Sequence, residues 1–149
     1  KICEQLQIPG VFVGGDSGAD LLQGSPLCKH LDYIDFEYAL SKALAIIHHG
    51  GMGTTAQAIK AGIPQLIRPI KYDQPDNADR IYQLGLGTYV MPERFKAEVV
   101  APIISNMLQK AKSSKALRHY AADVNNSSAI VDACDLIELE CKNREVKSD

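Results

Sequence analysis

The residue types best suited to chemistry are concentrated in residues 46–55, which read Ile-Ile-His-His-Gly-Gly-Met-Gly-Thr-Thr. Glycines let backbone N–H groups approach a ligand closely, and the start of a helix adds unpaired donors and the positive end of its dipole. Thr54 and Thr55 offer hydroxyl groups, and a histidine adds a further N–H donor. Together these groups predict a site for an anion, most simply phosphate or diphosphate.

Other interpretations of this segment stay open. A glycine-rich turn can serve packing alone, Thr54 can simply cap the helix, and His48 can be a packed side chain as readily as a ligand. The spacing Gly51-x-Gly53-x-x-Ala56, with Asp73 about 20 residues later, also matches a dinucleotide fingerprint. Such a fingerprint normally opens its domain, whereas a strand is expected before this one, and it leaves the adjacent histidines unexplained.

A second cluster, Asp73-Gln74, follows the next expected strand. The carboxyl ends of parallel strands meet at one edge of a sheet, where ligands bind, so this cluster should lie near the glycine turn. A carboxylate beside a carboxamide can hold the vicinal hydroxyls of a sugar. Asp73 and Asp76 could equally be the acidic first turn of a helix, but the order of the two clusters favours one shared site.

Alternation of strands and helices predicts an α/β fold with a parallel sheet. We expect a buried strand over 11–13, a loop over 15–29, and two closing helices at the C-terminal end, of which the second presents one apolar face (Ile130, Ala133, Cys134, Ile137 and Cys141). The continuous apolar run 43–47 predicts a strand covered on both faces. Further strands are expected at 31–34, 65–70 and 88–90, and helices at 36–42, 54–61, 76–84, 97–110, 113–123 and 127–141.

Composition excludes several classes of protein. The 149 residues are 46% hydrophobic and 23% charged, which excludes disorder over most of the chain. The net charge of −2 without a basic cluster argues against a nucleic-acid binder, and no apolar run is long enough to span a membrane. The four cysteines form no C-x-x-C pair, which predicts small apolar side chains in a reduced, cytoplasmic protein.

Residues 48–55, the Ala-Gly-Ile-Pro-Gln of 61–65, Pro69 and Asp73-Gln74 together resemble the donor-binding signature of the family 1 glycosyltransferases. These are two-domain GT-B enzymes that include bacterial antibiotic and macrolide transferases and sterol glucosyltransferases. The resemblance implies a Rossmann-like parallel sheet with helices on both faces, the C-terminal half of a GT-B fold. It also implies a partial donor domain over 1–141, truncated at its N-terminus so that the first strand is missing, and a charged tail over 142–149.

The resemblance assigns roles to particular residues. Those implied in diphosphate binding are His49, Gly51, Gly53 and Thr54. Asp73 and Gln74 fall on the pair that contacts the donor sugar. Tyr33 lies near a base-stacking aromatic, although two residues separate the positions, and Gln57 stands where the plant branch has a ribose-binding Glu.

The implied activity is transfer of a hexose, with inversion, from a nucleoside-diphosphate sugar to a hydroxyl of a small or lipophilic acceptor, with UDP-glucose as the expected donor. The acceptor domain and its catalytic base are not in this chain, so we expect no catalytic residue here and an inactive fragment. No cofactor or metal is expected. The expected partners are the nucleotide sugar and the missing N-terminal acceptor domain, but no nucleic acid, and peripheral membrane association stays open. The alternatives are an NAD(P)-binding oxidoreductase domain and a non-catalytic sugar-nucleotide-binding subunit.

Overall fold

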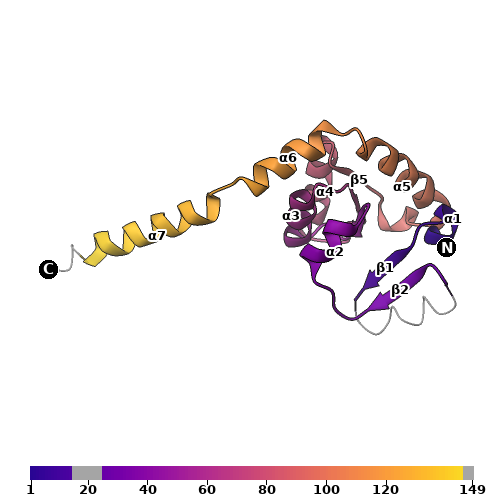
Figure 1. The fold of residues 1–149 in the computed structure, drawn as a ribbon, viewed down its shortest axis with the longest axis horizontal. Coiled ribbons are helices and arrows are strands. Elements are labelled where there is room, and N and C mark those ends of the chain that lie inside the picture. Colours follow the sequence, from indigo (N-terminus) through magenta and orange to yellow (C-terminus); the bar gives the residue numbers. More distant parts are fainter. Residues whose placement is uncertain (15–24, 146–149) are drawn as a thin grey trace.

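The computed structural model describes residues 1–14 and 25–145, so most of the loop expected over 15–29 lies outside the described residues. Strands and helices alternate through the first two thirds of the chain, and helices complete it (Figure 1). In chain order the elements are α1 (Ile2–Leu6), β1 (Gly10–Val13), β2 (Cys28–Leu31), α2 (Phe36–Lys42), β3 (Ile46–His48), α3 (Met52–Ala61), β4 (Gln65–Ile67), α4 (Gln74–Gln83), β5 (Gly87–Tyr89), the 3-10 helix η3 (Pro92–Arg94), α5 (Ala97–Ala111), α6 (Lys115–Asn125) and α7 (Ala129–Glu145).

The parallel arrangement is confirmed. The described strands form two sheets, β1-β2 and β3-β4-β5, and all three strand pairs are parallel. Helices cover both faces of the larger sheet. Neighbouring residues of β4 point to opposite faces, so the partners of each residue show which helices lie on that face. Leu66 packs in a core with residues of α5, and Ile67 packs in another with residues of α4 and α6. Both side chains are completely buried.

The expectation of a buried first strand was wrong. β1 forms, but Val11, Phe12 and Val13 are 56%, 46% and 36% exposed. Among the described residues β1 pairs with β2 alone. This two-stranded sheet leaves the apolar side chains of residues 11–13 without a covering layer on each face. β2 begins at Cys28 and ends at Leu31, earlier than the expected strand at 31–34, because its register is set by pairing with β1.

The strand expected over 43–47 is shorter and later. β3 comprises Ile46–His48, and Ile47 is 46% exposed, so this strand is not covered on both faces. The helix after it begins at Met52 instead of residue 54 and ends, as expected, at Gly62, whose φ of 67° is the left-handed conformation that glycine favours. Pro102 lies inside α5, beyond its first turn, and packing of the buried side chains of Val100 and Ile104 outweighs the missing backbone donor.

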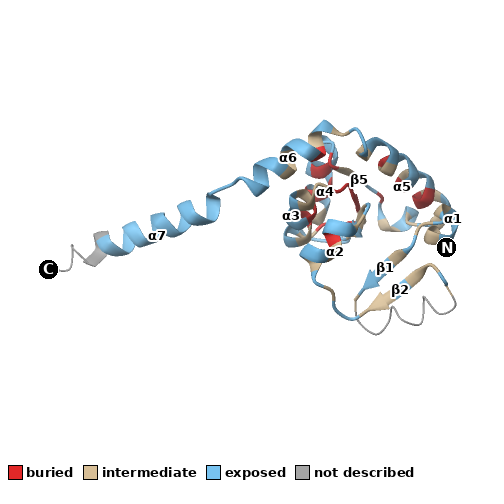
Figure 2. Ribbon diagram, in the orientation of Figure 1, coloured by how far each residue is buried: buried red, intermediate tan, exposed pale blue. Residues whose placement is uncertain are grey.

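The second closing helix is present but does not close the domain. α7 extends away from the rest of the molecule, and its described side chains are all exposed (Figure 2). Ile130 is 82% exposed and Ile137 65%, so the expected apolar face packs into no core among the residues that the structure describes. The helix continues past Lys142 to Glu145. Within residues 1–14 and 25–145, no helix is both long and apolar enough to cross a membrane.

Candidate functional site

A sharp glycine turn connects β3 to α3 at the carboxyl edge of the larger sheet. Gly50 is buried and has a φ of 94°, a conformation that side chains with a Cβ rarely adopt. A Cβ at this position would lie 2.9 Å from Cγ2 of Ile67 and 3.2 Å from the backbone oxygen of Gln74. Glycine is therefore required here, and the turn packs directly against the start of α4.

The N-terminus of α3 is open. Its N-cap residue is Gly51, no side chain among residues 1–14 and 25–145 caps it, and its first turn contains no acidic residue. A Cβ on Gly53 would meet no atom within 4 Å, so the backbone at this position faces free space. The hydroxyl of Thr55 donates back to the Gly51 carbonyl (2.9 Å), while that of Thr54 makes no hydrogen bond with the described residues. The first amides of α3 thus present unpaired donors and an uncompensated dipole.

His48 and His49 play different parts, because His48 is the last residue of β3 and His49 lies beyond it in the glycine turn. His48 Nδ1 accepts a hydrogen bond from the backbone N–H of Gly50 (3.2 Å), so in the neutral ring Nε2–H donates to Oε1 of Gln65 (2.9 Å). Burial lowers the pKa of His48, and the neighbouring His49 lowers it further. The hydrogen bond with Gln65 raises the pKa, but the net shift is downward. His48 is therefore a neutral side chain that holds the turn to β4.

His49 is exposed and lies beside the helix entrance. Its Nε2 is 2.7 Å from where a Cβ of Gly51 would stand, so the ring occupies the space that the missing side chain of Gly51 leaves. The imidazole therefore lies against the residue that begins α3. Of the two histidines, only His49 is free to reach a ligand at this helix end.

The acidic cluster adjoins the glycine turn through a residue that sequence reasoning missed. Asn77, 6% exposed, donates from Nδ2 both to the Gly50 carbonyl and to Oδ2 of Asp73, each at 2.9 Å. One amide thus joins the two predicted clusters. Its position four residues after Asp73, on the same face of a predicted helix, was the available signal.

Gln74 organises the loop that precedes it. Its Oε1 accepts hydrogen bonds from the backbone N–H groups of Ile70 (2.9 Å) and Lys71 (3.2 Å), so its amide nitrogen remains as the free donor. Tyr72 adopts a φ of 60°, rare for a residue with a side chain, and is 81% exposed. The loop is therefore closed by Gln74 and presents the residues before Asp73 outward.

Gln65 belongs to the signature quoted from the sequence, but sequence reasoning gave it no role. Its side chain is fully buried in β4, where it accepts from His48 and donates to the Thr55 carbonyl at 3.4 Å. An amide within an otherwise apolar strand was the signal for it.

The two weaker candidates are not joined to this arrangement. Tyr33 is 83% exposed between β2 and α2, and Gln57 is exposed on α3, one turn after Gly53. Neither a hydrogen bond nor an aromatic contact connects either side chain to the glycine turn within residues 1–14 and 25–145. Their assignment to the base and ribose stays a prediction.

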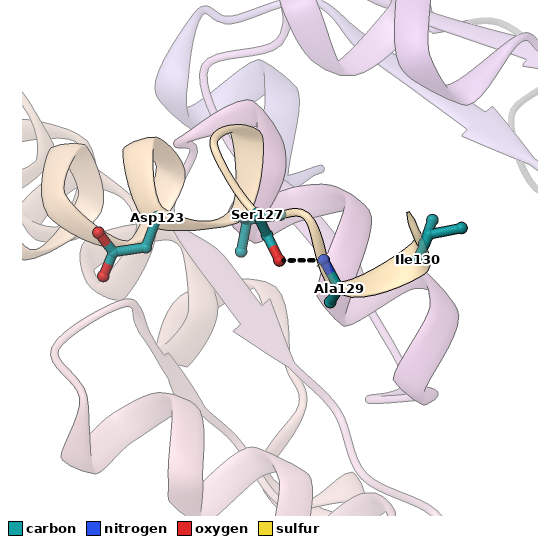
Figure 3. A pocket seen from close by; sticks show the side chains of 5 residues that line it. Asp123, Ser127, Ala129 and Ile130 are labelled. Atoms are coloured by element: carbon teal, nitrogen blue, oxygen red, sulfur yellow. Dashed lines mark hydrogen bonds between the residues drawn. The ribbon is translucent and has the colours of Figure 1, made fainter. Parts of the chain in front are cut away.

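A hollow of about 380 Å³ lies elsewhere, where α6 passes into α7 (Figure 3). Its lining includes Asp123, Ser127 and Ile130, and the Ser127 hydroxyl accepts from the Ala129 N–H at 3.2 Å. Asn125, beside it, donates to the Lys60 carbonyl at the C-terminal end of α3. The hollow is thus at the opposite end of α3 from the glycine turn and is not part of that site.

Comparison with known proteins decides the family. Residues 16–136 match the model described as "Erythromycin biosynthesis protein CIII-like, C-terminal domain". The chain belongs to this family. This C-terminal domain is found in family 1 GT-B glycosyltransferases, as the resemblance implied, and the fold is confirmed with it. The oxidoreductase alternative was therefore wrong, because the family covers the glycine turn together with the second cluster.

Individual relatives agree with the family. The chain is 31% identical over 135 residues to O-mycaminosyltylonolide 6-deoxyallosyltransferase of Streptomyces fradiae, covering 90% of this chain and 31% of that protein. It is 28% identical to a sterol 3-beta-glucosyltransferase of Cryptococcus neoformans, covering 91% of this chain and 8% of that one. The structure of the spinosyn forosaminyltransferase SpnP superposes with a TM-score of 0.77 at 21% identity, over 90% of this chain and 35% of SpnP. The chain thus spans a third or less of the length of these two sequence relatives.

Proposed function

We propose that this chain is the donor-binding half of a glycosyltransferase that takes a hexose from a nucleoside-diphosphate sugar. The observation that supports it most is Asn77, whose amide joins the Gly50 carbonyl to Asp73. It fixes an anion-binding helix end beside a carboxylate and a carboxamide, which is the combination that a sugar diphosphate requires. The named relatives transfer both glucose and a deoxysugar, and UDP-glucose is the donor we put first.

In this proposal the diphosphate binds at the N-terminus of α3, with His49, Gly51, Gly53 and Thr54 as its contacts. Asp73 and Gln74 hold the sugar hydroxyls. Charge develops on the departing diphosphate as the anomeric bond breaks, and the open amides of α3 and the imidazole of His49 stabilise it without a metal cofactor. An acceptor hydroxyl, deprotonated by a base from another part of the protein, attacks the anomeric carbon from the opposite side and inverts it.

The experiment is calorimetric titration of the 149-residue chain, after circular dichroism has shown it folded, with UDP, UDP-glucose, dTDP-glucose and NAD. We expect a nucleoside diphosphate or its sugar to bind, and NAD to remain silent. Preference between the uridine and thymidine ligands identifies the base. Binding of NAD alone would contradict the proposal.

The sugar contacts are tested by Asp73→Ala and Gln74→Ala. Both substitutions should weaken binding of the nucleotide sugar more than that of the bare nucleotide, since only the sugar reaches these side chains. Asp79→Ala, which removes an exposed carboxylate later on α4, is the matched control. Equal losses for both ligands would show that the cluster does not contact the sugar.

A further inference from the structure

Two of the four cysteines lie near each other, on α1 and at the edge of the smaller sheet. Cys3 belongs to α1, and Cys28 is the first residue of β2. Both are half-buried and free, whereas Cys134 and Cys141 on α7 are exposed. The proposed donor site uses none of the four.

The backbone around this pair brings the two thiols to one side of the sheet. Cys28 pairs in register with Gly10 of β1, and register partners on parallel strands point the same way, about 5 Å apart. A Cβ on Gly10 would lie 2.6 Å from Sγ of Cys3. The Cys3 sulfur thus occupies the space that Gly10 leaves empty, on the side of the sheet to which its register partner Cys28 points. This placement makes the two thiols neighbours that a disulfide could join.

The position of α1 gives such a bond a structural consequence. Ile2 and Leu6, on either side of Cys3, pack against the core beneath the larger sheet, which contains Leu66 and Val100. Cys28 belongs to the smaller sheet, and no strand pairing joins the two sheets among the described residues. A bond between Cys3 and Cys28 would therefore attach the smaller sheet covalently to the core of the larger one.

We propose that Cys3 and Cys28 are a site of reversible disulfide formation that locks the two sheets together under oxidising conditions. A low-molecular-weight disulfide such as oxidised glutathione is the oxidant. One cysteine attacks it and forms a mixed disulfide, releasing one reduced glutathione. The second cysteine then displaces the other glutathione, so that two thiols become one disulfide and the oxidant is reduced to two thiols.

The environment sets the rate of this reaction. Burial raises the pKa of the Cys3 thiol, and its hydrogen bond with Cys28 raises it further. Little of it is thiolate at neutral pH, so the pair should form slowly but give a bond protected from reduction.

The sequence supplies an internal control for the test. Trypsin releases Cys3 and Cys28 together in the peptide of residues 2–29, and Cys134 and Cys141 together in that of residues 119–142. The second pair lies two turns apart on α7, about 10.5 Å along the helix axis, too far for a disulfide without unfolding. Both pairs are therefore read in one digest of the same sample.

The 149-residue chain is equilibrated with oxidised glutathione, its remaining thiols are blocked with N-ethylmaleimide, and the digest is weighed by mass spectrometry. We expect the 2–29 peptide to lose two hydrogen atoms and carry no maleimide, and the 119–142 peptide to form no internal disulfide. In concentrated urea we expect the opposite result, with a disulfide in the 119–142 peptide in preference to the 2–29 peptide. The segment between Cys134 and Cys141 is the shorter one, and closure of a shorter segment is favoured in an unfolded chain. Two maleimides or two glutathiones on the 2–29 peptide of the folded chain would overturn the proposal.

Thermal unfolding tests the lock itself. Oxidation should raise the midpoint by about 10 °C, because the bond closes a long loop in the unfolded chain. Cys134→Ser should retain this rise, and Cys3→Ser should lose it. A disulfide in the 2–29 peptide without any rise would mean that the bond forms but does not hold the sheets together.

Discussion

The N-termini of α3 and α4 lie next to each other at one edge of the larger sheet, yet they differ in their capping residues and in the charge of their first turns. α4 begins with Asp73 at its N-cap, has a proline in its first turn that removes one unpaired donor, and adds Asp76. α3 begins with a glycine and contains neither a capping side chain nor an acid in its first turn. The dipole of α4 is met by its own carboxylates, whereas no carboxylate in the first turn of α3 meets the dipole of that helix.

In the proposed function, the two parts of a sugar diphosphate bind at the two helix ends. The open end suits phosphate, which brings its own negative charge. The acidic end suits hydroxyl groups, which need acceptors. Asn77 holds the two ends together, since it donates to Gly50 on one side and Asp73 on the other.

The largest effect should come from making α3 resemble α4. Gly53→Asp places a carboxylate in the open first turn without a clash, because a Cβ there meets nothing within 4 Å. We expect nucleoside diphosphate binding to fall by about 100-fold, from repulsion of about 3 kcal/mol. Gly53→Ala adds bulk without charge and is the control, with a smaller loss in calorimetry. Equal affinity for Gly53→Asp and the unaltered chain would refute the anion site.

Removing the histidine at the open end should have the next largest effect. His49→Ala deletes a donor beside Gly51 and should weaken nucleoside diphosphate binding by roughly 1–3 kcal/mol, the scale of a charge-assisted hydrogen bond. His119→Ala, which changes an exposed histidine on α6, should leave the affinity unaltered. Calorimetry measures both variants, and an undiminished affinity for His49→Ala would remove this residue from the site.

Cutting the link between the two helix ends should reduce stability. Asn77→Ala leaves the buried Gly50 carbonyl and Asp73 without their shared donor, and we expect the free energy of unfolding to fall by about 1–2 kcal/mol. Asn106→Ala, an exposed asparagine within α5, is the matched control and should be neutral or slightly stabilising. Urea denaturation compares them, and equal stability of the two variants would mean that the link is not formed.

The smallest effect should be a dependence on pH from His48. Its pKa is lower in the folded chain than the ordinary value near 6.5, so below that pH the unfolded chain binds more protons. Its contribution to stability is therefore complete above pH 6.5 and is lost as the pH falls. His48→Gln should flatten the slope of unfolding free energy between pH 7 and about pH 5. An unchanged slope would show that His48 titrates alike in both states.

Sequence reasoning predicted where the candidate residues lie better than how they are held in place. The glycines, the Asp73-Gln74 pair and their shared sheet edge followed from residue type and from the rule that parallel strands end together. It did not predict the roles of Asn77 and Gln65, because these roles depend on which carbonyl or imidazole group lies opposite each side chain in the folded chain. The separate tasks of His48 and His49 likewise needed the partners of each ring.

The sequence by itself determined the order of strands and helices and the end of α3 at Gly62, because these are local properties of the backbone. The anion site at residues 46–55 stays a prediction from the sequence. Only the tertiary structure decided burial. β1 and β4 are similarly apolar, yet β4 is enclosed and β1 is exposed. The apolar face expected on α7 has no partner within the described part of the chain. Enclosure depends on neighbours distant in the sequence, and no local pattern specifies them.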